Sequence, residues 1–339
     1  MRAALFEECG DPEAVLTVRE HPVPQPGPGQ VRVRMLASPI NPSDLMYVRG
    51  VYGRTPRLPA TPGFEGVGVV EESGGGLLGR LIVGKRVCTL TAEGGAWAEY
   101  ALVDARKAIP LPSSLSDEQG ATFFVNPATA LIMTRKVLAV PKGEWLLQTA
   151  AGSALGKMVI RLGAHYGFRT INIVRRPEQA DELKQLGADV VLVFDPDRDS
   201  SEDVITQVRE LTAGGVQYAI DPVGGATGSA VVESLGNQAS MLVYGTLSSE
   251  PLTFSPRALM GHLAGIRGFW LGPWMEQQSL PAKLRIVSEI KRLIASGVLG
   301  TDVRESVPLD SIQTAVATAQ QTGQDGKVLL QLGNGTTTG

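Results

Sequence analysis

Three groups of residues in this chain have types and spacing that could do chemistry. The stretch "PGFEGVGVV", residues 62–70, sets the carboxylate of Glu65 among apolar residues and glycines, directly after a phenylalanine. A loop of small residues, "TAAGSALG" at 149–156, permits close backbone approach to a phosphate. Two adjacent arginines, Arg175 and Arg176, are suited to binding an anion. The carboxylate needs a strand and a turn to position it, and the loop and the arginines need strands that lead into helices.

Composition restricts the class of protein. The chain has 339 residues, a net charge of −3, a pI near 5.8 and 43% hydrophobic residues, which indicate a globular protein of two domains with no preference for nucleic acid or membrane. The first residues lack the features of signal and transit peptides, and no run approaches 18 apolar residues. Two cysteines, Cys9 and Cys88, are too few for a disulfide framework or a four-cysteine zinc site. We therefore expect a cytoplasmic protein.

Residues 1–120 predict a β-rich domain with few long helices. The clearest strand is "VRVRML", in which Val31, Val33 and Met35 fall on one face and two arginines fall on the other. Later pieces such as "GRLIVGKRVCTL" and "AWAEYALV" have the same strand character.

Residues 121–260 predict a doubly wound domain. From about residue 144, five apolar strands ("EWLLQT", "RTINIV", "DVVLVF", "VQYAID" and "SMLVYG") alternate with four helices. In the helix over "SEDVITQVRELTAG", Val204, Val208 and Leu211 share a face. Such alternation predicts an α/β fold with a parallel sheet that is covered on both sides.

Residues 261–339 leave two arrangements open. A long amphipathic helix, "LPAKLRIVSEIKRLIAS", places Leu284, Val287, Ile290 and Ile294 on one side, and the strand "KVLLQL" precedes a frayed tail, "GNGTTTG". This part either extends the parallel sheet or returns to pack on the first domain, and we expect the return.

The loop at 149–156 joins the first strand of the alternating region to its first helix, where a dinucleotide pyrophosphate would lie. Its glycines do not spell the G-x-G-x-x-G pattern, so the loop alone is a weak signal, which the strand order strengthens. At the end of the second strand, where an acidic residue would bind the ribose of NAD, stand Arg175 and Arg176. Guanidinium groups suit a 2′-phosphate, and we expect no carboxylate at this strand end to repel it, so NADPH is favoured over NADH. Two solvated arginines at a helix start are the alternative.

Several motifs occur in an order that resembles the medium-chain dehydrogenase/reductase superfamily over essentially the whole chain. They are "NPSD" (41–44), "GVYG" (50–53), "PGFEGVG" (62–68), "VNPATA" (125–130), the loop at 149–156, "DPVGG" (221–225) and "GFWL" (268–271). The resemblance implies a GroES-like, β-rich catalytic domain built from both ends of the chain, a central Rossmann domain, and a homodimer formed through the Rossmann sheets.

The resemblance also separates zinc-dependent members of the superfamily from zinc-free ones. In the zinc branch a cysteine stands where Asn41 aligns, a histidine where Phe64 stands, and a third ligand near Val125. All three ligands are missing here, and a catalytic zinc site needs about three protein donors. We therefore expect no zinc, and an apolar pocket floor at Phe64. For Glu65 we expect a polar or basic partner and a structural role, with the partner left unnamed.

Among zinc-free members, the chain looks more like the 2-enoyl thioester reductases than like the quinone reductases, which stay as the alternative. The resemblance implies hydride transfer from NADPH to the β-carbon of an alkene conjugated to a carbonyl. It assigns Tyr52 to polarise the carbonyl or supply the proton, since a phenol is protonated at neutral pH; an ordinary loop aromatic is the alternative. A non-catalytic NADPH-binding protein is the alternative of another class.

Further site residues follow from the resemblance and from the ends of the predicted strands. The substrate pocket is expected to contain Asn41, Phe64, Trp270 and Trp274, and the cofactor to contact Asn126, Thr129, Ala151, Gly152, Ser153, Ala154, Leu155, Gly156, Arg175, Arg176, Val223, Gly224, Tyr244, Gly245, Phe269 and Trp270. A helix N-cap is an equal interpretation of Asn126, and the two tryptophans also suit a core or a dimer interface. The expected substrate is a small enoyl thioester or quinone, and acyl carrier protein is a candidate partner.

Overall fold

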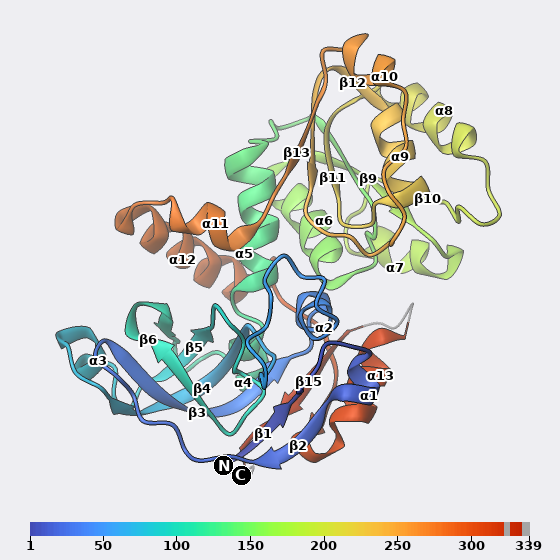
Figure 1. Ribbon diagram of the computed structural model, residues 1–339. Helices are drawn as coiled ribbons and strands as arrows, with labels where there is room; N and C mark the ends of the chain where they lie inside the picture. The colour runs from blue at the N-terminus through green and yellow to red at the C-terminus, as the bar shows by residue number, and fades with distance from the viewer. Residues whose placement is uncertain (322–325, 334–339) are drawn as a thin grey trace. The chain divides into compact units, whose positions relative to one another are not determined.

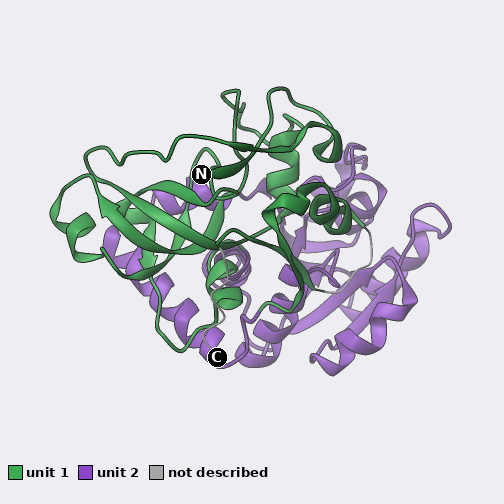
Figure 2. Cartoon of the chain, turned by 90° about the horizontal axis from the view of Figure 1, so that it is seen from below, with its two compact units in different colours: residues 1–125, 301–339 green, residues 126–300 purple. Residues whose placement is uncertain are grey.

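The computed structural model describes residues 1–321 and 326–333, which form two compact units. Unit 1 takes Met1–Val125 and the chain from Thr301 on, and unit 2 takes Asn126–Gly300 (Figure 2). The expected return to the first domain at residue 261 therefore differs from the structure, which places the return at Thr301. The predicted frayed tail lies, from residue 334 on, outside the described residues.

Unit 1 is built on a sheet of seven strands in the order β14-β15-β3-β4-β5-β7, with β6 paired to β3, and on a separate pair, β1-β2 (Figure 1). Its strands are β1 (Arg2–Leu5), β2 (Thr17–Glu20), β3 (Gln30–Pro39), β4 (Glu65–Ser73), β5 (Arg86–Leu90), β6 (Tyr100–Asp104), β7 (Ala108–Pro110), β14 (Val303–Pro308) and β15 (Lys327–Gln331). Its helices are α1 (Pro12–Val15), α2 (Pro42–Val48), α3 (Leu77–Leu81), α4 (Asp117–Ala121) and α13 (Ile312–Gln320), with 3₁₀ turns η1 (Ala105–Lys107) and η4 (Leu309–Ser311).

Strand β3 confirms the alternating pattern read from the sequence. Val31, Val33 and Met35 are fully buried, and the arginines between them form ion pairs with Glu72 and Glu71 of the antiparallel neighbour β4. Alternation with a period of two thus sends one face of the strand into the core and the other toward charged partners. The stretch "GRLIVGKRVCTL" is only partly strand, because its first residues, 79–81, end helix α3 and β5 begins at Arg86.

Unit 2 is a parallel sheet in the order β10-β9-β8-β11-β12-β13, which confirms the predicted doubly wound fold. The strands are β8 (Trp145–Gln148), β9 (Arg169–Val174), β10 (Val190–Val193), β11 (Val216–Asp221), β12 (Leu235–Val243) and β13 (Gly265–Gly268). The helices are α5 (Val125–Ile132, continued by a π-helical turn, Met133–Val137), α6 (Ala154–Tyr166), α7 (Ala180–Gln185), α8 (Ser201–Leu211), α9 (Gly225–Glu233), α10 (Pro256–Met260), α11 (Leu271–Glu276) and α12 (Leu280–Ala295), with a 3₁₀ turn η3 (Pro177–Gln179) before α7.

Two hydrophobic clusters cover the two faces of this sheet. Ile171 and Ile173 of β9 pack with residues of α8 and α9, whereas Val174 packs with Ile160 of α6 and Leu183 of α7. Because adjacent residues of a strand point to opposite faces, α8 and α9 cover one face and α6 and α7 cover the other.

Two predicted helix faces need correction. In α8 the buried residues are Val204, Ile205 and Val208, and Leu211 is 39% exposed at the last turn. In α12, Leu284 is 60% exposed, and the buried face is formed by Ile286, Ile290, Leu293 and Ile294. Within the described residues, no helix combines the length and the apolar character that crossing a membrane requires.

Candidate nucleotide site and candidate substrate residues

The strand order of unit 2 reverses between β8 and β11, and several of the predicted cofactor residues lie in the loops that follow the carboxyl ends of these two strands. The hydroxyl of Thr149, just after β8, donates to the carboxylate of Asp221, the last residue of β11. A hydrogen bond therefore joins the two strand ends at the place where open parallel sheets bind ligands.

The loop after β8 brings backbone N–H groups to the start of α6. Ser153 is the N-cap, and its hydroxyl accepts from the N–H of Gly156 at 3.1 Å. Any Cβ at Gly156 would stand 2.5 Å from the carbonyl oxygen of Ala151, so only glycine permits this close approach of helix and loop. The N–H groups of Ala154 and Leu155 have no acceptor among the described residues, and both sit at the positive end of the helix dipole. This loop can hold a phosphate.

A second turn, after β11, is held by Asp221. Its fully buried carboxylate accepts from the N–H of Val223 at 3.0 Å and from the N–H of Gly224 at 2.8 Å. Gly224 has a φ of 76°, which favours glycine. Burial raises the pKa of Asp221, while Thr149 and the two N–H donors oppose that rise.

Tyr244, directly after β12, presents a buried hydroxyl that has no hydrogen-bond partner among the described residues. Burial and the nearby Asp221 raise the pKa of this phenol, so it stays protonated and able to donate. Unpaired buried donors are rare in proteins, so the orphaned hydroxyl of Tyr244, the open N–H groups of α6 and the glycine turn together fit a bound dinucleotide.

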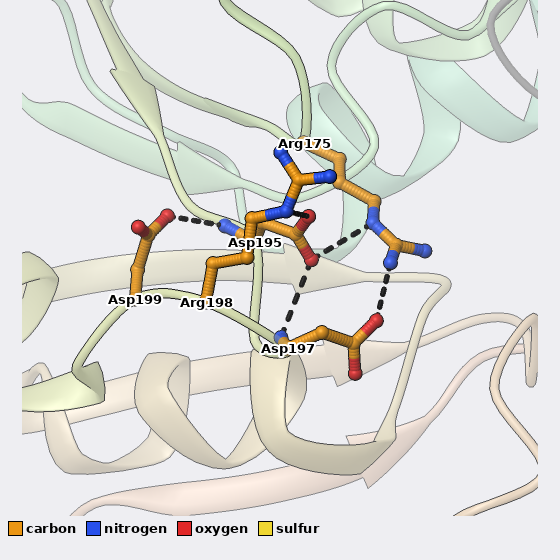
Figure 3. A network of polar contacts seen from close by, with 5 residues as sticks. All are labelled: Arg175, Asp195, Asp197, Arg198 and Asp199. Carbon is orange, nitrogen blue, oxygen red and sulfur yellow. Dashed lines mark hydrogen bonds and ion pairs between the residues drawn. The ribbon is translucent and has the colours of Figure 1, made fainter.

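Arg175 follows β9 as predicted, but the sequence interpretation that no carboxylate lies there is wrong (Figure 3). Its Nε donates to Oδ1 of Asp195 at 3.0 Å, and its Nη2 forms an ion pair with Asp197. Both acids lie in the loop after the neighbouring strand β10, which the parallel sheet brings alongside the end of β9. The guanidinium of Arg175 therefore has two carboxylate partners in this structure.

In unit 1, Tyr52 lies in the loop after α2 and packs against Phe64. Their ring centroids are 5.1 Å apart, and Phe64 also contacts the ring of Tyr47 edge-on at 5.3 Å. Both Tyr52 and Phe64 are half-buried on the core of this unit. An aromatic ring, with no lone pair to offer a metal, thus supports the loop tyrosine.

The carboxylate of Glu65, the first residue of β4, accepts three hydrogen bonds. Its Oε1 accepts from Nδ2 of Asn41 at 3.0 Å, and its Oε2 accepts from the N–H groups of Val125 at 2.9 Å and Phe124 at 3.3 Å. Glu65 is 2% exposed. The buried carboxylate ties the start of α2 to the start of α5, which agrees with the predicted polar partner and structural role.

The same network contains a second buried carboxylate. Asp44 accepts from the N–H of Asn41 at 2.8 Å and from the N–H of Phe64 at 3.0 Å. Burial raises the pKa of Asp44 to about 7 and raises the pKa of Glu65, while the same burial lowers the pKa of the nearby Lys327. Asn41 is thus occupied as a structural linker: its amide N–H donates to Glu65, and its buried Oδ1 has no partner among the described residues.

The remaining predicted residues are distributed over unit 2. Asn126 is the second residue of α5, inside the helix, so the N-cap interpretation is wrong, and Thr129 is buried one turn later. Phe269 is buried after β13, Trp270 is 39% exposed, and Trp274 is half-buried in α11.

Comparison with known proteins covers both units. Residues 27–113 match the family described as alcohol dehydrogenase GroES-like domain, and residues 154–289 match the family described as zinc-binding dehydrogenase. The mitochondrial enoyl-[acyl-carrier-protein] reductase of Homo sapiens is 31% identical over 98% of this chain and 89% of its own length.

The chain belongs to the medium-chain dehydrogenase/reductase superfamily.

Solved structures of this superfamily share the fold over nearly the whole chain. The Etr1p/NADP/crotonyl-CoA complex has a TM-score of 0.82 at 27% identity, covering 97% of this chain and 99% of that one. Escherichia coli quinone oxidoreductase complexed with NADPH has a TM-score of 0.87 at 25% identity, covering 98% and 100%. The protein is therefore an oxidoreductase of the medium-chain dehydrogenase/reductase type.

One matching family is described as zinc-binding. Within the described residues, however, no group of three or more His, Cys, Asp or Glu side chains could hold a metal ion. Of the two cysteines, Cys88 is buried and Cys9 is exposed.

Sequence reasoning missed three acids at the candidate nucleotide site. Asp221 lies inside the quoted "DPVGG" motif, where an Asp before a Gly-rich turn is itself a signal that the carboxylate caps the turn. Asp195 and Asp197 lie 20 and 22 positions after Arg175, and only the order of strands brings them together.

Proposed function

We propose that the protein is a zinc-independent, NADPH-dependent reductase of an activated C=C bond, and that its substrate is a trans-2-enoyl thioester of coenzyme A or acyl carrier protein. The relatives whose names describe enoyl reductases span almost the whole chain, and the Etr1p complex was solved with NADP and crotonyl-CoA. These likenesses support the class of substrate and cofactor.

The observation that carries the proposal is the packing of Tyr52 on Phe64, at the position where zinc-dependent members place a histidine. Reduction of a conjugated alkene builds negative charge on the carbonyl oxygen, and some group must stabilise it. The phenol of Tyr52 donates a hydrogen bond to that oxygen or gives its proton to the α-carbon. Phe64 keeps the ring in place, and Glu65 holds the β4 turn that carries Phe64.

The cofactor is assigned to the carboxyl ends of β8, β9, β11 and β12. The N–H groups at the start of α6 bind the pyrophosphate, and the turn around Gly224 and the hydroxyl of Tyr244 bind further along the dinucleotide. When bound, NADPH supplies the hydride that goes to the β-carbon.

The test is an assay of NADPH oxidation with three electron acceptors: crotonyl-CoA, a quinone and a simple enone. We expect crotonyl-CoA to be reduced fastest. Tyr52→Phe should lower turnover by about 10²-fold to 10⁴-fold, the usual contribution of a positioned proton donor, and leave NADPH binding unchanged. Near-normal turnover by Tyr52→Phe would remove Tyr52 from the mechanism, and zinc at one equivalent in the purified protein would overturn the zinc-independent proposal.

Quinone reduction is the second candidate, and the TM-score of 0.87 with the NADPH complex of the E. coli quinone oxidoreductase favours it. Faster turnover of the quinone than of crotonyl-CoA would establish it. NADPH binding without oxidation by any acceptor would instead support a non-catalytic NADPH-binding protein.

We also propose a homodimer joined along β13, which is the last strand of its sheet and is largely exposed over Gly265–Gly268. An unpaired strand edge is a template for pairing with a second copy. Light scattering in solution should give twice the monomer mass. A cytoplasmic location stays a prediction from the sequence, whereas the name of the Homo sapiens enoyl-[acyl-carrier-protein] reductase places that protein in mitochondria.

A further inference from the structure

The loop after β10 surrounds Arg175 with carboxylates (Figure 3). Asp195 accepts from Arg175 Nε at 3.0 Å, and Asp197 pairs with Arg175 Nη2. Arg198 Nε lies 3.6 Å from Asp195, and Asp199 accepts from the N–H of Asp195 at 2.7 Å. Three carboxylates and two guanidinium groups leave this cluster with one net negative charge.

We propose that Asp197 sets how strongly the protein prefers a nucleotide with a 2′-phosphate, because its carboxylate competes with that phosphate for the guanidinium of Arg175. This inference rests on the proposed use of NADPH. It concerns the adenosine end of the cofactor, however, and is tested by binding alone.

The two acids on Arg175 have different surroundings. Asp195 has a side chain that is 13% exposed, accepts from the N–H of Asp197 at 3.3 Å, and so holds the loop in shape. Asp197 has a side chain that is 74% exposed, and the side chain of Arg175 is 58% exposed. Asp197 is therefore the partner that a ligand from solvent can replace without unfolding the loop.

Whether a ligand replaces Asp197 as the partner of Arg175 depends on the charge of that ligand. An exposed ion pair contributes little to stability, and a phosphate carries more charge than a carboxylate and binds a guanidinium through two parallel hydrogen bonds. A 2′-phosphate thus displaces Asp197 at a small cost. A nucleotide with a free 2′-hydroxyl leaves the Asp197–Arg175 pair intact and gains nothing from Arg175.

Removal of the competing carboxylate should therefore tighten binding of 2′-phosphorylated nucleotides only. The test measures dissociation constants of 2′,5′-ADP and 5′-AMP by calorimetry, and of NADPH and NADH by fluorescence, for the full-length protein and Asp197→Asn. We expect Asp197→Asn to bind 2′,5′-ADP and NADPH about twofold to fivefold more tightly, the range that an exposed ion pair supplies. Binding of 5′-AMP and NADH should stay within error of the unmodified protein.

A double-mutant cycle with Arg175→Met separates competition for Arg175 from a general field effect. In the Arg175→Met background, Asp197→Asn should no longer change binding of 2′,5′-ADP. Asp203→Asn, which removes an equal charge from the exposed first turn of α8, is the matched control and should leave the ratio of the two dissociation constants unchanged.

Four outcomes would overturn the inference. They are weaker binding of 2′,5′-ADP by Asp197→Asn, unchanged binding, an equal gain in Asp203→Asn, and a gain that persists without Arg175. Failure of the unmodified protein to bind either NADPH or NADH would be a different result, because it would overturn the proposed function itself. Each variant should have the melting temperature of the unmodified protein, which shows that the substitution leaves the fold intact.

Discussion

Replacement of Glu65 tests the buried network in the first unit most severely. Glu65→Leu leaves three donors without an acceptor: Nδ2 of Asn41 and the N–H groups of Phe124 and Val125. Each unsatisfied buried donor costs about 1–3 kcal/mol. Removal of the carboxylate offsets part of this loss of stability, because burial of Glu65 disfavours its charged form. We therefore expect a net loss of about 2–5 kcal/mol in the free energy of unfolding.

Glu65→Gln should cost less, about 1–3 kcal/mol, because its one carbonyl oxygen serves one side of the network while its amide group faces a donor on the other. Urea denaturation followed by tryptophan fluorescence gives the stabilities, and hydrogen exchange read by mass spectrometry reports loss of protection around Phe124 and Val125. Glu71→Gln, at the surface of the same strand, is the control and should change stability by less than about 0.5 kcal/mol. An unfolding midpoint for Glu65→Leu equal to that of the unmodified protein, with unchanged protection, would refute the assigned role.

Two further predictions concern pH and the helix cap. Burial raises the pKa of Asp44 to about 7, above the roughly 3.9 of an unfolded chain, so the folded state binds this proton more tightly. The stability that this proton supplies is therefore complete below about pH 4 and is lost as the pH rises through about 7, with a slope of at most about 1.4 kcal/mol per pH unit; Asp44→Asn should flatten the slope in urea titrations between pH 5 and 8, and an unchanged slope would contradict the assignment. Ser153→Ala removes the cap of α6 and should lower stability by about 1 kcal/mol; a calorimetric melt that does not shift would show that the cap contributes nothing.

The sequence predicted those parts of the fold that depend on local pattern. Val31, Val33 and Met35 alternate with charged residues, and a strand with this period has one way to bury them. Helix α12 was harder, because apolar residues cover most of its circumference. Leu284 and Ile286 are both plausible core residues by spacing, and only tertiary packing decides that Ile286 is buried and Leu284 exposed.

Contacts between residues distant in sequence could not be predicted from one chain. Asn41 precedes Glu65 by 24 residues, and Val125 follows it by 60, so no spacing rule indicates that they meet. The same holds for Asp197, which reaches Arg175 because β9 and β10 are neighbours in the sheet. The motifs thus indicate which residue types are present, whereas the hydrogen-bond and ion-pair partners of those residues become known only from the three-dimensional structure.

The most direct test of the proposed reaction is to follow the hydride with an isotope. The protein is incubated with crotonyl-CoA and NADPH that carries deuterium at the transferred position of its nicotinamide, and the product is analysed by mass spectrometry and NMR. The account predicts butyryl-CoA with one deuterium at the β-carbon, and far less of it from Tyr52→Phe. NADPH that is oxidised without labelling of the β-carbon, or crotonyl-CoA that is recovered unchanged, would contradict it.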